Sequence, residues 1–340
     1  MPKPKNKPKK SSVSASKVAE LAGVSRSAVS RTFTDGASVS ADTRARVLAA
    51  AEKLGYHVNH LARGLRERSN IVCLVVANLH TQVRAHLVDL LTRRLQAAGR
   101  ITMVLNTESD TDAVSRALRQ TLHYRADATV VLSGAPPASL IETCLANGQQ
   151  VILINRGETL DGAARIGIDN TLAGTAAFHL LRRAGCARLA VVTSGTRTAS
   201  LVERERAFTA AARAAGVEAA VTEVGPSSYA AGQDAARLVF GRSRTPDGVF
   251  CTTDLLALGF MDVARRDFAL RLPEDLCLIG FDNIDEAGWD SYRLTTFAQP
   301  FAAITDAVME LLADPATAGA ARRLIEPQPV WRNTVRPGRA

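Results

Sequence analysis

Residues 14–68 most constrain what this chain can fold into, because they contain three short helical patterns in series. The first two meet at the A-G-V-S turn of residues 22–25, where Ser25 can cap the second helix. Ser40 can cap the third helix, and Gly55 ends it. We expect one small core built by Ala15, Val18, Leu21, Ala22, Val29, Phe33, Val47, Leu48, Ala51 and Leu54. This pattern is typical of a helix-turn-helix, whose second helix is suited to the major groove of DNA.

The expected outward face of the second helix carries short or cationic hydrogen-bond donors. Arg26 and Ser27 stand at its start, and Arg31 lies one turn later. Side chains at the start of a recognition helix reach base edges, and this predicts base contacts for Arg26 and Ser27. A guanidinium paired with O6 and N7 of guanine is the commonest specific contact, so Arg26 and Arg31 are the first candidates. Contacts to phosphates, which fix position rather than sequence, are predicted for Ser14, Ser25 and Ser30. A contact to phosphate alone remains the alternative for both arginines.

The net charge of the chain is confined to its N-terminal part. Residues 1–70 contain 14 Lys and Arg against 5 Asp and Glu, whereas residues 71–340 contain 28 of each. A polyanionic partner is therefore indicated for the basic segment, since neutralising phosphates releases counterions and drives binding. Residues 1–13 form a Lys/Pro arm that is expected to be disordered when free, and either contacts the DNA backbone or is only a solvated tail.

Cysteine usage and hydropathy indicate the compartment. The five cysteines are widely spaced, without a C-x-x-C pair, and are expected to be reduced, mostly buried thiols rather than metal ligands or disulfides. The N-terminus lacks the apolar segment of a signal peptide, and no apolar run reaches membrane-spanning length. We therefore expect a cytoplasmic, nucleoid-associated protein without a membrane partner.

A further short helix is predicted after Tyr56. Asn59 can cap it, and Leu61 and Leu65 share one face at a spacing of four residues. Gly64 lowers its stability by about 1 kcal/mol relative to alanine, so this helix needs DNA and a second copy of itself to form. Asn59 is predicted to contact the DNA backbone, and Leu65 to wedge between base steps in the minor groove.

These motifs together resemble the LacI/GalR family of bacterial transcriptional regulators. The resemblance rests on V-A-x-L-A-G-V-S-x-x-x-V-S-R at residues 18–31, V-S-x-x-T-R-x-R-V-L-x-A-A-x-x-L-G-Y at residues 39–56, and the N-x-L-A-R-x-L segment at residues 59–65. It continues with VFCTTDLLALG at residues 249–259, LCLIGFDN at 276–283 and LTTFAQP at 294–300. The family usually has Pro where Val58 stands and commonly Thr where Ala28 stands, so both departures affect the expected docking on DNA.

The remainder of the chain alternates between short apolar runs and helix-length segments. Strands are expected at 71–77, 101–106, 128–132 and 151–154, and again at 188–193, 221–224, 248–251 and 276–281. Helices are expected at 83–98, 112–124, 138–147, 172–184, 201–215, 229–240 and 255–268. Two successive β-α-β series imply an α/β core with two doubly wound parallel sheets, in addition to the all-α headpiece.

The resemblance adds that strands near residues 297 and 330 return across the boundary, which gives a two-lobed core like a periplasmic binding protein that dimerises. The resulting division is an arm at 1–13, the helix-turn-helix domain at 14–58, a hinge helix and linker at 59–70, and the core at 71–340. Within the core, the N-subdomain is expected at about 71–168 plus 299–325, and the C-subdomain at about 169–296 plus 326–335.

Ligands of such a core bind between the lobes, beyond the carboxyl ends of the strands. From the polar residues at these ends we select Asn78, His80, Asn155, Thr253 and Asp282. The resemblance adds Arg204 as the effector-binding arginine of the family and supports Asp282 as the acidic residue that binds effector hydroxyls. Asp and Arg in one cleft suit a vicinal diol or a small carboxylate.

Other roles are considered for Asp282, His80 and two neighbouring residues. Asp282 can instead cap a turn, and Asp254, which follows Thr253, is expected to be a helix N-cap. His80 and the nearby Arg84 are expected to be a solvated pair on the dimer face. If His80 and Arg84 line the cleft, they favour an acidic effector. Asn155 and Thr253 stand where many family members have Asp and Asn.

The sequence contains no motif typical of an enzyme. A G-x-S-x-G elbow, a P-loop and a G-x-G-x-x-G turn are all absent, and the six histidines form no ligand-spaced cluster, so we expect no catalytic residue, metal or cofactor. The expected function is a homodimeric repressor that binds a pseudo-palindromic double-stranded DNA operator and responds to a small-molecule effector. The alternative is a sugar-binding protein or sugar-processing enzyme with an incidental basic N-terminus, which would have no use for the helix-turn-helix and hinge. Activation, the sign of the effector response and tetramer formation stay open.

Overall fold

The computed structural model describes residues 14–33, 37–56, 69–108, 110–132, 136–155, 161–242, 245–314 and 321–338. Contacts divide the chain into two compact units, Met1–Ser69 and Asn70–Ala340, which are described separately. Two predicted features lie outside the described residues, namely the arm at 1–13 and the hinge helix with Asn59 and Leu65.

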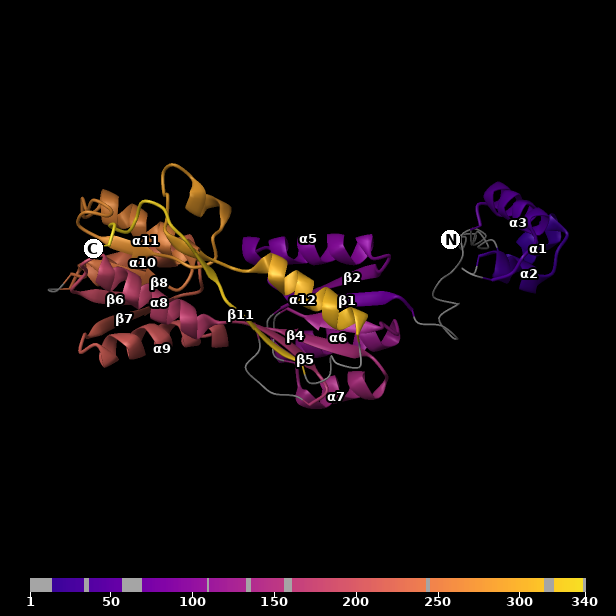
Figure 1. Cartoon of the computed structure of the whole chain (residues 1–340), viewed down its shortest axis with the longest axis horizontal. Helices are drawn as coiled ribbons and strands as arrows, with labels where there is room; N and C mark the ends of the chain where they lie inside the picture. The colour runs from indigo at the N-terminus through magenta and orange to yellow at the C-terminus, as the bar shows by residue number, and fades with distance from the viewer. Residues whose placement is uncertain are drawn as a thin grey trace, which may run out of the picture. The chain divides into compact units, whose positions relative to one another are not determined.

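The described residues of the first unit form helices α1 (Ala15–Ala22), α2 (Arg26–Thr32) and α3 (Ala41–Leu54) (Figure 1). The predicted caps are confirmed. The Ser25 hydroxyl accepts a hydrogen bond from Ala28 N at 3.2 Å, and the Ser40 hydroxyl accepts one from Thr43 N at 3.3 Å. Gly55 ends α3 in the left-handed conformation, with φ of 62°, which a side chain would strain.

The core of this unit differs from the prediction at two leucines. Leu21 and Leu48 are each 46% exposed, so their placement in the core was wrong. The buried residues are Val18, Ala19, Ala22, Val29, Val47, Ala50 and Ala51, with Ala15, Phe33 and Leu54 packed against them. Small alanine side chains let the three short helices pack closely. The helix faces that become buried in this packing do not include Leu21 and Leu48.

The N-terminal lobe of the second unit is built on a six-stranded parallel sheet with the order β11-β5-β4-β3-β1-β2. Its strands are β1 (Ile71–Ala77), β2 (Ile101–Thr107), β3 (Ala128–Val131), β4 (Gln150–Ile154), β5 (Ala164–Ile168) and β11 (Arg322–Ile325). Helices α5 (Gln82–Ala97) and α12 (Phe301–Ala313) pack on one face. Helices α6 (Thr111–His123) and α7 (Ala138–Ala146) pack on the other face.

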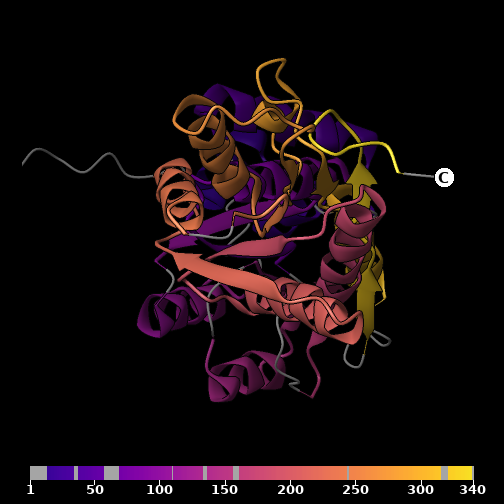
Figure 2. The same cartoon turned by 90° about the vertical axis from the view of Figure 1, so that its left-hand side faces the viewer.

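The C-terminal lobe, which faces the viewer in Figure 2, repeats this architecture. Its four-stranded parallel sheet has the order β7-β6-β8-β9. Its strands are β6 (Leu189–Ser194), β7 (Ala219–Val224), β8 (Gly248–Cys251) and β9 (Cys277–Ile279). Alternate residues face opposite layers: Val191 packs with α8 (Asn170–Arg183) and α9 (Ala199–Ala214), whereas Val192 packs with α10 (Tyr229–Phe240) and α11 (Asp254–Arg266). Both sheets are thus covered on both faces, as continuous apolar strands require.

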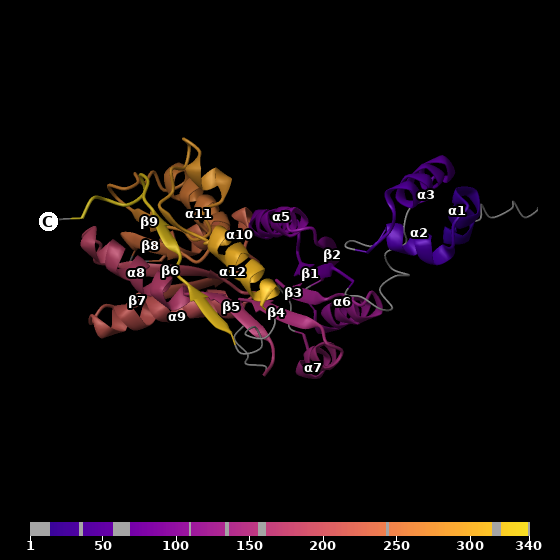
Figure 3. The same cartoon turned by 45° about the vertical axis from the view of Figure 1, so that its right-hand side comes forward.

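The chain passes between the lobes more than once. After the short 3₁₀ turn η1 (Asp285–Gly288), strand β10 (Thr296–Ala298) pairs antiparallel with β12 (Gln328–Val330). Between these two strands the chain forms α12 and β11 in the N-terminal lobe, where β11 lies beside β5 (Figures 1 and 3). The C-terminal segment then rejoins the other lobe, since Leu278 N donates to Thr334 O at 2.8 Å.

Most expected elements agree with these bounds, but β5 and β11 were not predicted. Strand β5 reads A-R-I-G-I, with partly exposed residues at alternate positions, and β11 has a single partly buried residue. Both lack the continuous apolar run that identified the other strands. Among the helices within the described ranges, none combines the length and apolar character needed to cross a bilayer.

Candidate functional sites

Helix α2 presents a cationic, polar surface. Arg26, Ser27, Ser30 and Arg31 are exposed, whereas Val29 and Thr32 on the same helix are buried. The Ser27 hydroxyl lies 2.8 Å from the hydroxyl of Ser25. Ser14 precedes α1 and is also exposed, and its side chain makes no capping hydrogen bond.

Arginines of α3 hold the ends of the first two helices. Arg44 Nη1 donates to Thr32 O at 3.0 Å, and Arg46 Nη1 donates to Ala22 O at 3.3 Å. Cations at helix C-termini complement the helix dipole. Arg26 and Arg31, in contrast, make no hydrogen bond or ion pair with any residue that the structure describes, so their guanidinium groups are available to an anionic or hydrogen-bonding partner.

Asp282 follows β9 and lies buried next to β10. Its backbone N donates to Phe297 O at 2.9 Å, and its Oδ1 accepts a hydrogen bond from Gln299 Nε2 at 2.7 Å. Burial raises the pKa of Asp282, while the positive charges of Arg204 and Arg84 oppose this shift. Gln299, which directly follows β10, thus holds the carboxylate. The positive charges that act on it come from Arg204 in the C-terminal lobe and Arg84 in the N-terminal lobe.

Arg204 lies on α9, and only 4% of its surface is exposed. Its Nε donates to Asn170 Oδ1 and its Nη1 donates to Thr252 O, both at 2.8 Å. The guanidinium carbon lies 3.3 Å from the centroid of the Phe281 ring. Burial lowers the pKa of Arg204 to about 10, and the charge of Asp282 raises it. Arg204 therefore stays cationic and is fixed in orientation.

Thr253 and Asp254 occupy the start of α11. Thr253 is the N-cap residue, and its hydroxyl is buried without a hydrogen-bond partner among the described residues. Asp254 was predicted to be the N-cap, which is wrong by one position. Its fully buried carboxylate instead accepts hydrogen bonds from Thr296 Oγ1 at 2.6 Å and from Ile284 N at 3.0 Å, and it thereby ties α11 to the β9–β10 region. Burial, followed by the charge of Asp282, raises the pKa of Asp254.

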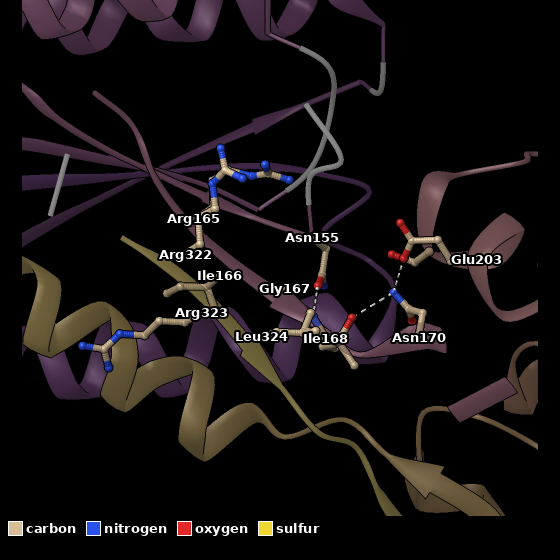
Figure 4. A pocket seen from close by; sticks show the side chains of 11 residues that line it. Asn155, Arg165, Ile166, Gly167, Ile168, Asn170, Glu203, Arg322, Arg323 and Leu324 are labelled. Carbon is tan, nitrogen blue, oxygen red and sulfur yellow. Dashed lines mark hydrogen bonds between the residues drawn. The ribbon is translucent and has the colours of Figure 1, made fainter. Parts of the chain in front are cut away.

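Asn155 borders a pocket of about 340 Å³ that is lined from both lobes (Figure 4). Its Oδ1 accepts a hydrogen bond from Ile168 N at 3.1 Å. Across the pocket, Asn170 Nδ2 donates to Glu203 Oε2 at 3.0 Å. Asn170 also binds Arg204, so a single residue connects the lining of the pocket with the buried charged cluster of Arg204, Asp254 and Asp282.

The loop after β1 brings the remaining candidates to the N-terminal lobe. Asn78 and His80 are exposed on this loop. Arg84 is only partly exposed, and its Nη1 donates to Ala77 O at 2.9 Å. Burial lowers the pKa of Arg84, and the charge of Asp282 raises it. The expected solvated pair is therefore wrong for Arg84, whose cation faces the cluster.

Sequence reasoning missed three polar residues at this site, namely Asn170, Glu203 and Gln299. Asn170 and Glu203 lie within helical segments that carry no local signal, and only the pairing of α8 with α9 brings them together. Gln299 stands before Pro300 in the L-T-T-F-A-Q-P segment, so this motif contained the signal. Gln82 Nε2 also donates to Glu286 Oε1 at 2.7 Å, which joins α5 of one lobe to η1 of the other.

Comparisons with known proteins agree with both units. The model of bacterial regulatory proteins of the lacI family matches residues 16–59, and that of the periplasmic binding protein-like domain matches residues 178–335. The chain is 27% identical over 299 residues to the HTH-type transcriptional regulator GalR of Escherichia coli K12, covering 86% of both chains. It is 26% identical over 327 residues to the HTH-type transcriptional repressor CytR of the same organism, covering 94% of this chain and 95% of CytR. Residues 16–59 are thus a DNA-binding domain of the lacI family.

The fold of the chain is that of the Lac repressor. A crystal structure of the Lac repressor dimer, bound to operator and the anti-inducer ONPF, superposes with a TM-score of 0.85 at 21% identity, covering 96% of this chain and 100% of that chain. With its lacI-type DNA-binding domain and with relatives that are named as transcriptional regulators, the chain is a DNA-binding transcriptional regulator that has a helix-turn-helix headpiece and a two-lobed α/β core. Its relatives are named as regulators and not as enzymes.

Proposed function

We propose that this regulator is a homodimeric repressor that binds a pseudo-palindromic DNA operator. A small-molecule effector that occupies the inter-lobe site lowers or raises the affinity of the repressor for this operator. The observation that supports this most directly is the separation of two charged features. The exposed guanidinium groups of Arg26 and Arg31 lie in one unit, and the buried charged cluster lies in the other. A change at the core then alters DNA affinity through the segment that joins the units. Such coupling between distant sites amounts to about 1–3 kcal/mol.

On the DNA side, Arg26, Ser27 and Arg31 read base edges, and Leu65 of the hinge wedges between base steps. Exposure of the three α2 side chains supports the first assignment, and the sequence pattern alone supports the second. The DNA backbone is contacted by Ser14, Ser25, Ser30 and Asn59. The Ser25 hydroxyl oxygen accepts the capping hydrogen bond of α2, and its O–H group can donate to a phosphate.

On the effector side, the ligand is a sugar, a sugar acid or a related metabolite. The orphaned hydroxyl of Thr253, the carboxylate of Asp282 and the cation of Arg204 supply the mixture of donors and acceptors that hydroxyl groups require. We assign Asn155, which borders the pocket, to the same site, together with Asn78 and His80 from the loop after β1 of the N-terminal lobe. Both lobes then contribute polar side chains to the ligand.

Dimerisation is supported by an apolar sheet edge. Strand β2 ends the sheet of the N-terminal lobe, and its Ile101 and Val104 are 45% and 39% exposed. An edge strand with exposed apolar side chains is a template for a second copy. A repressor of this kind acts in the cytoplasm, on the nucleoid.

The test is operator selection from a random duplex library with the purified full chain, first without ligand and then with pooled sugars, sugar acids and nucleosides. Recovery of a pseudo-palindrome with a flexible central step supports two recognition helices and a paired hinge. Binding that lacks a motif under both conditions and only falls with salt contradicts the proposal. Leu65→Ala should lower operator affinity far more than non-specific affinity.

The effector assignment has its own variant. Asp282→Asn keeps an acceptor for Gln299 but removes the charge, so operator binding should persist while the response to the effector is lost. Asp285→Ala, at an exposed position three residues later, is the matched control and should respond as the parent does. An unchanged dose–response curve for Asp282→Asn removes this residue from the site.

A further inference from the structure

Two cysteines meet at the end of the C-terminal lobe that is opposite to Asp282. Cys186 lies between α8 and β6, and Cys277 is the first residue of β9, whose other end leads to Asp282. Both side chains are fully buried. Cys186 Sγ donates to Asp247 O at 3.3 Å, and Cys277 Sγ donates to Pro273 O at 3.7 Å. Although 90 residues separate the two cysteines in the sequence, both sulfur atoms accept a hydrogen bond from the same residue, Arg336.

Arg336 of the C-terminal segment contacts both sulfur atoms. Its backbone N donates to Cys277 Sγ at 3.4 Å, and its Nη2 donates to Cys186 Sγ at 3.2 Å. The other donors of the guanidinium are held by backbone carbonyls, with Nε on Ala184 O at 2.9 Å and Nη1 on Pro273 O at 2.7 Å. A fixed cation therefore adjoins the dithiol.

Gly248 provides the space in which the two thiols meet. It begins β8, which lies between β6 and β9 in the sheet. A Cβ atom at this position would lie 2.8 Å from Cys186 Cβ and 3.0 Å from Cys186 Sγ. Only glycine leaves room for Cys186 to extend over the intervening strand.

The two thiols differ in acidity. The neighbouring Cys186 thiol, together with the backbone N–H and charge of Arg336, lowers the pKa of Cys277 to about 7. The neighbouring Cys277 thiol and burial raise the pKa of Cys186. Burial also raises the pKa of each remaining cysteine, Cys73, Cys144 and Cys251. Because the thiolate is the reactive form, Cys277 is the most nucleophilic of the five.

A polar pocket of about 440 Å³ lies directly beside the dithiol. Gly185, Asp247 and Arg336 line it. Each of them touches or adjoins Cys186, since Gly185 precedes it in the chain, Asp247 O lies 3.3 Å from its Sγ, and Arg336 donates to that sulfur. Residues that contact or adjoin Cys186 thus line a recess that is large enough for a small oxidant.

We propose that Cys186 and Cys277 form a modification site, a dithiol that a hydroperoxide converts into an intramolecular disulfide. The Cys277 thiolate attacks the peroxide oxygen: an S–O bond forms, the O–O bond breaks, and the leaving hydroxide takes a proton to become water. Cys186 then loses its proton and attacks the sulfenic sulfur, which forms the S–S bond and expels a second hydroxide that becomes water. Two thiols and one hydrogen peroxide thus yield one disulfide and two waters, with two electrons passing from sulfur to oxygen.

The experiment uses the full-length reduced protein and hydrogen peroxide at pH 7. Remaining thiols are alkylated after denaturation, and the peptides are mapped by mass spectrometry. We expect two of the five cysteines to be lost together, in a peptide pair that links residues 186 and 277 and that dithiothreitol separates. Near-UV circular dichroism of each sample establishes that the fold is retained during oxidation.

Three variants assign the roles. Cys186→Ser should stop at a sulfenic acid on Cys277, captured by dimedone, and Cys277→Ser should slow oxidation of residue 186 by about tenfold or more, because an ordinary thiol near pKa 8.5 is only a few per cent ionised at pH 7. Cys73→Ser is the matched control, in which the 186–277 link should form at the parental rate. The rate in the parent should rise with pH through about 7. The proposal is wrong if both cysteines remain alkylatable, or if Cys73, Cys144 or Cys251 oxidises first.

Discussion

Arg204 lies over the ring of Phe281, with its guanidinium carbon 3.3 Å from the ring centroid. Phe281 directly precedes Asp282, so the residue that supports the cation and the residue that carries the opposite charge are neighbours in the chain. Stacking on the ring and two hydrogen bonds to Asn170 and Thr252 fix the guanidinium without a ligand. A cation that is already oriented loses little conformational entropy when a ligand binds.

Replacing Arg204 should destabilise the core unit. Arg204→Met leaves Asn170 Oδ1 and Thr252 O without their donor and leaves Asp282 without its nearest cation, which should lower the free energy of unfolding by about 3 kcal/mol. The measurement is denaturant unfolding of the full chain, followed by tryptophan fluorescence. Arg213→Met, at an exposed position of the same helix, is the matched control and should stay within about 0.5 kcal/mol of the parent. Equal losses in both variants would show that the network of Arg204 contributes nothing.

The charged pair itself was predictable from the sequence, but its surroundings were not. Arg204 and Asp282 stand in motifs that resemble those of the family, and strand periodicity placed Asp282 at the end of β9. The partners Asn170, Glu203 and Gln299 come from other segments, and their contacts exist only after the helices pack and the chain recrosses. Local patterns contain no information about such contacts.

The same distinction applies to the fold. Continuous apolar runs identified β1, β3, β4, β6 and β8, because strands buried on both faces need them. Strands β5 and β11 are short and partly exposed, and they pair only with each other and with β4. Leu21 and Leu48 were misplaced because helix periodicity defines an apolar face but not which edge of it the neighbouring helix covers.

The close contact between α10 and α11 depends on glycine. A Cβ at Gly259 would lie 1.9 Å from Tyr229 O, and one at Gly232 would lie 2.2 Å from Leu256 O. Gly259→Ala should therefore lower the free energy of unfolding by at least about 2 kcal/mol, although alanine favours a helix by about 1 kcal/mol. Thermal unfolding measures this loss. Gly225→Ala, where a Cβ meets no atom within 4 Å, should be neutral, and a neutral Gly259→Ala would contradict the tight packing.

Stability should fall as pH rises through the range in which the buried carboxyl groups ionise. The pKa of Asp254 is raised to about 7 and that of Asp282 to about 6, both by burial, from an ordinary value of 3.8. Between about pH 4 and 7 the folded chain therefore binds more protons than the unfolded chain, so its stability decreases with increasing pH. A pKa difference of one unit corresponds to about 1.4 kcal/mol, so the two raised pKa values together correspond to a loss of several kcal/mol across this window.

Asp254→Asn isolates this effect, because the amide can still bind Ile284 N and Thr296 Oγ1 without a charge. Unfolding by urea at pH 5, 6, 7 and 8 should show a smaller slope in this variant than in the parent. Asp275→Asn is the control. The hydrogen bonds from Arg271 lower the pKa of Asp275 to about 2, so its contribution is lost only at lower pH and the slope in the window should not change. A parental slope in Asp254→Asn would mean that this carboxyl group does not titrate in the window.

Arg26 offers the sharpest test of the recognition surface. Its side chain is exposed at the start of α2 and is not bonded to any described residue, so Arg26→Ala should leave the headpiece folded. If the guanidinium pairs with a guanine edge, the variant should lose about 1–3 kcal/mol of operator affinity and tolerate other bases at one position of each half-site. Lys53→Ala removes an exposed cation from α3 and should keep the parental sequence preference. Binding measured against operators substituted at every position separates the two roles, because a phosphate contact of Arg26 would weaken all sequences equally and reduce the dependence on salt.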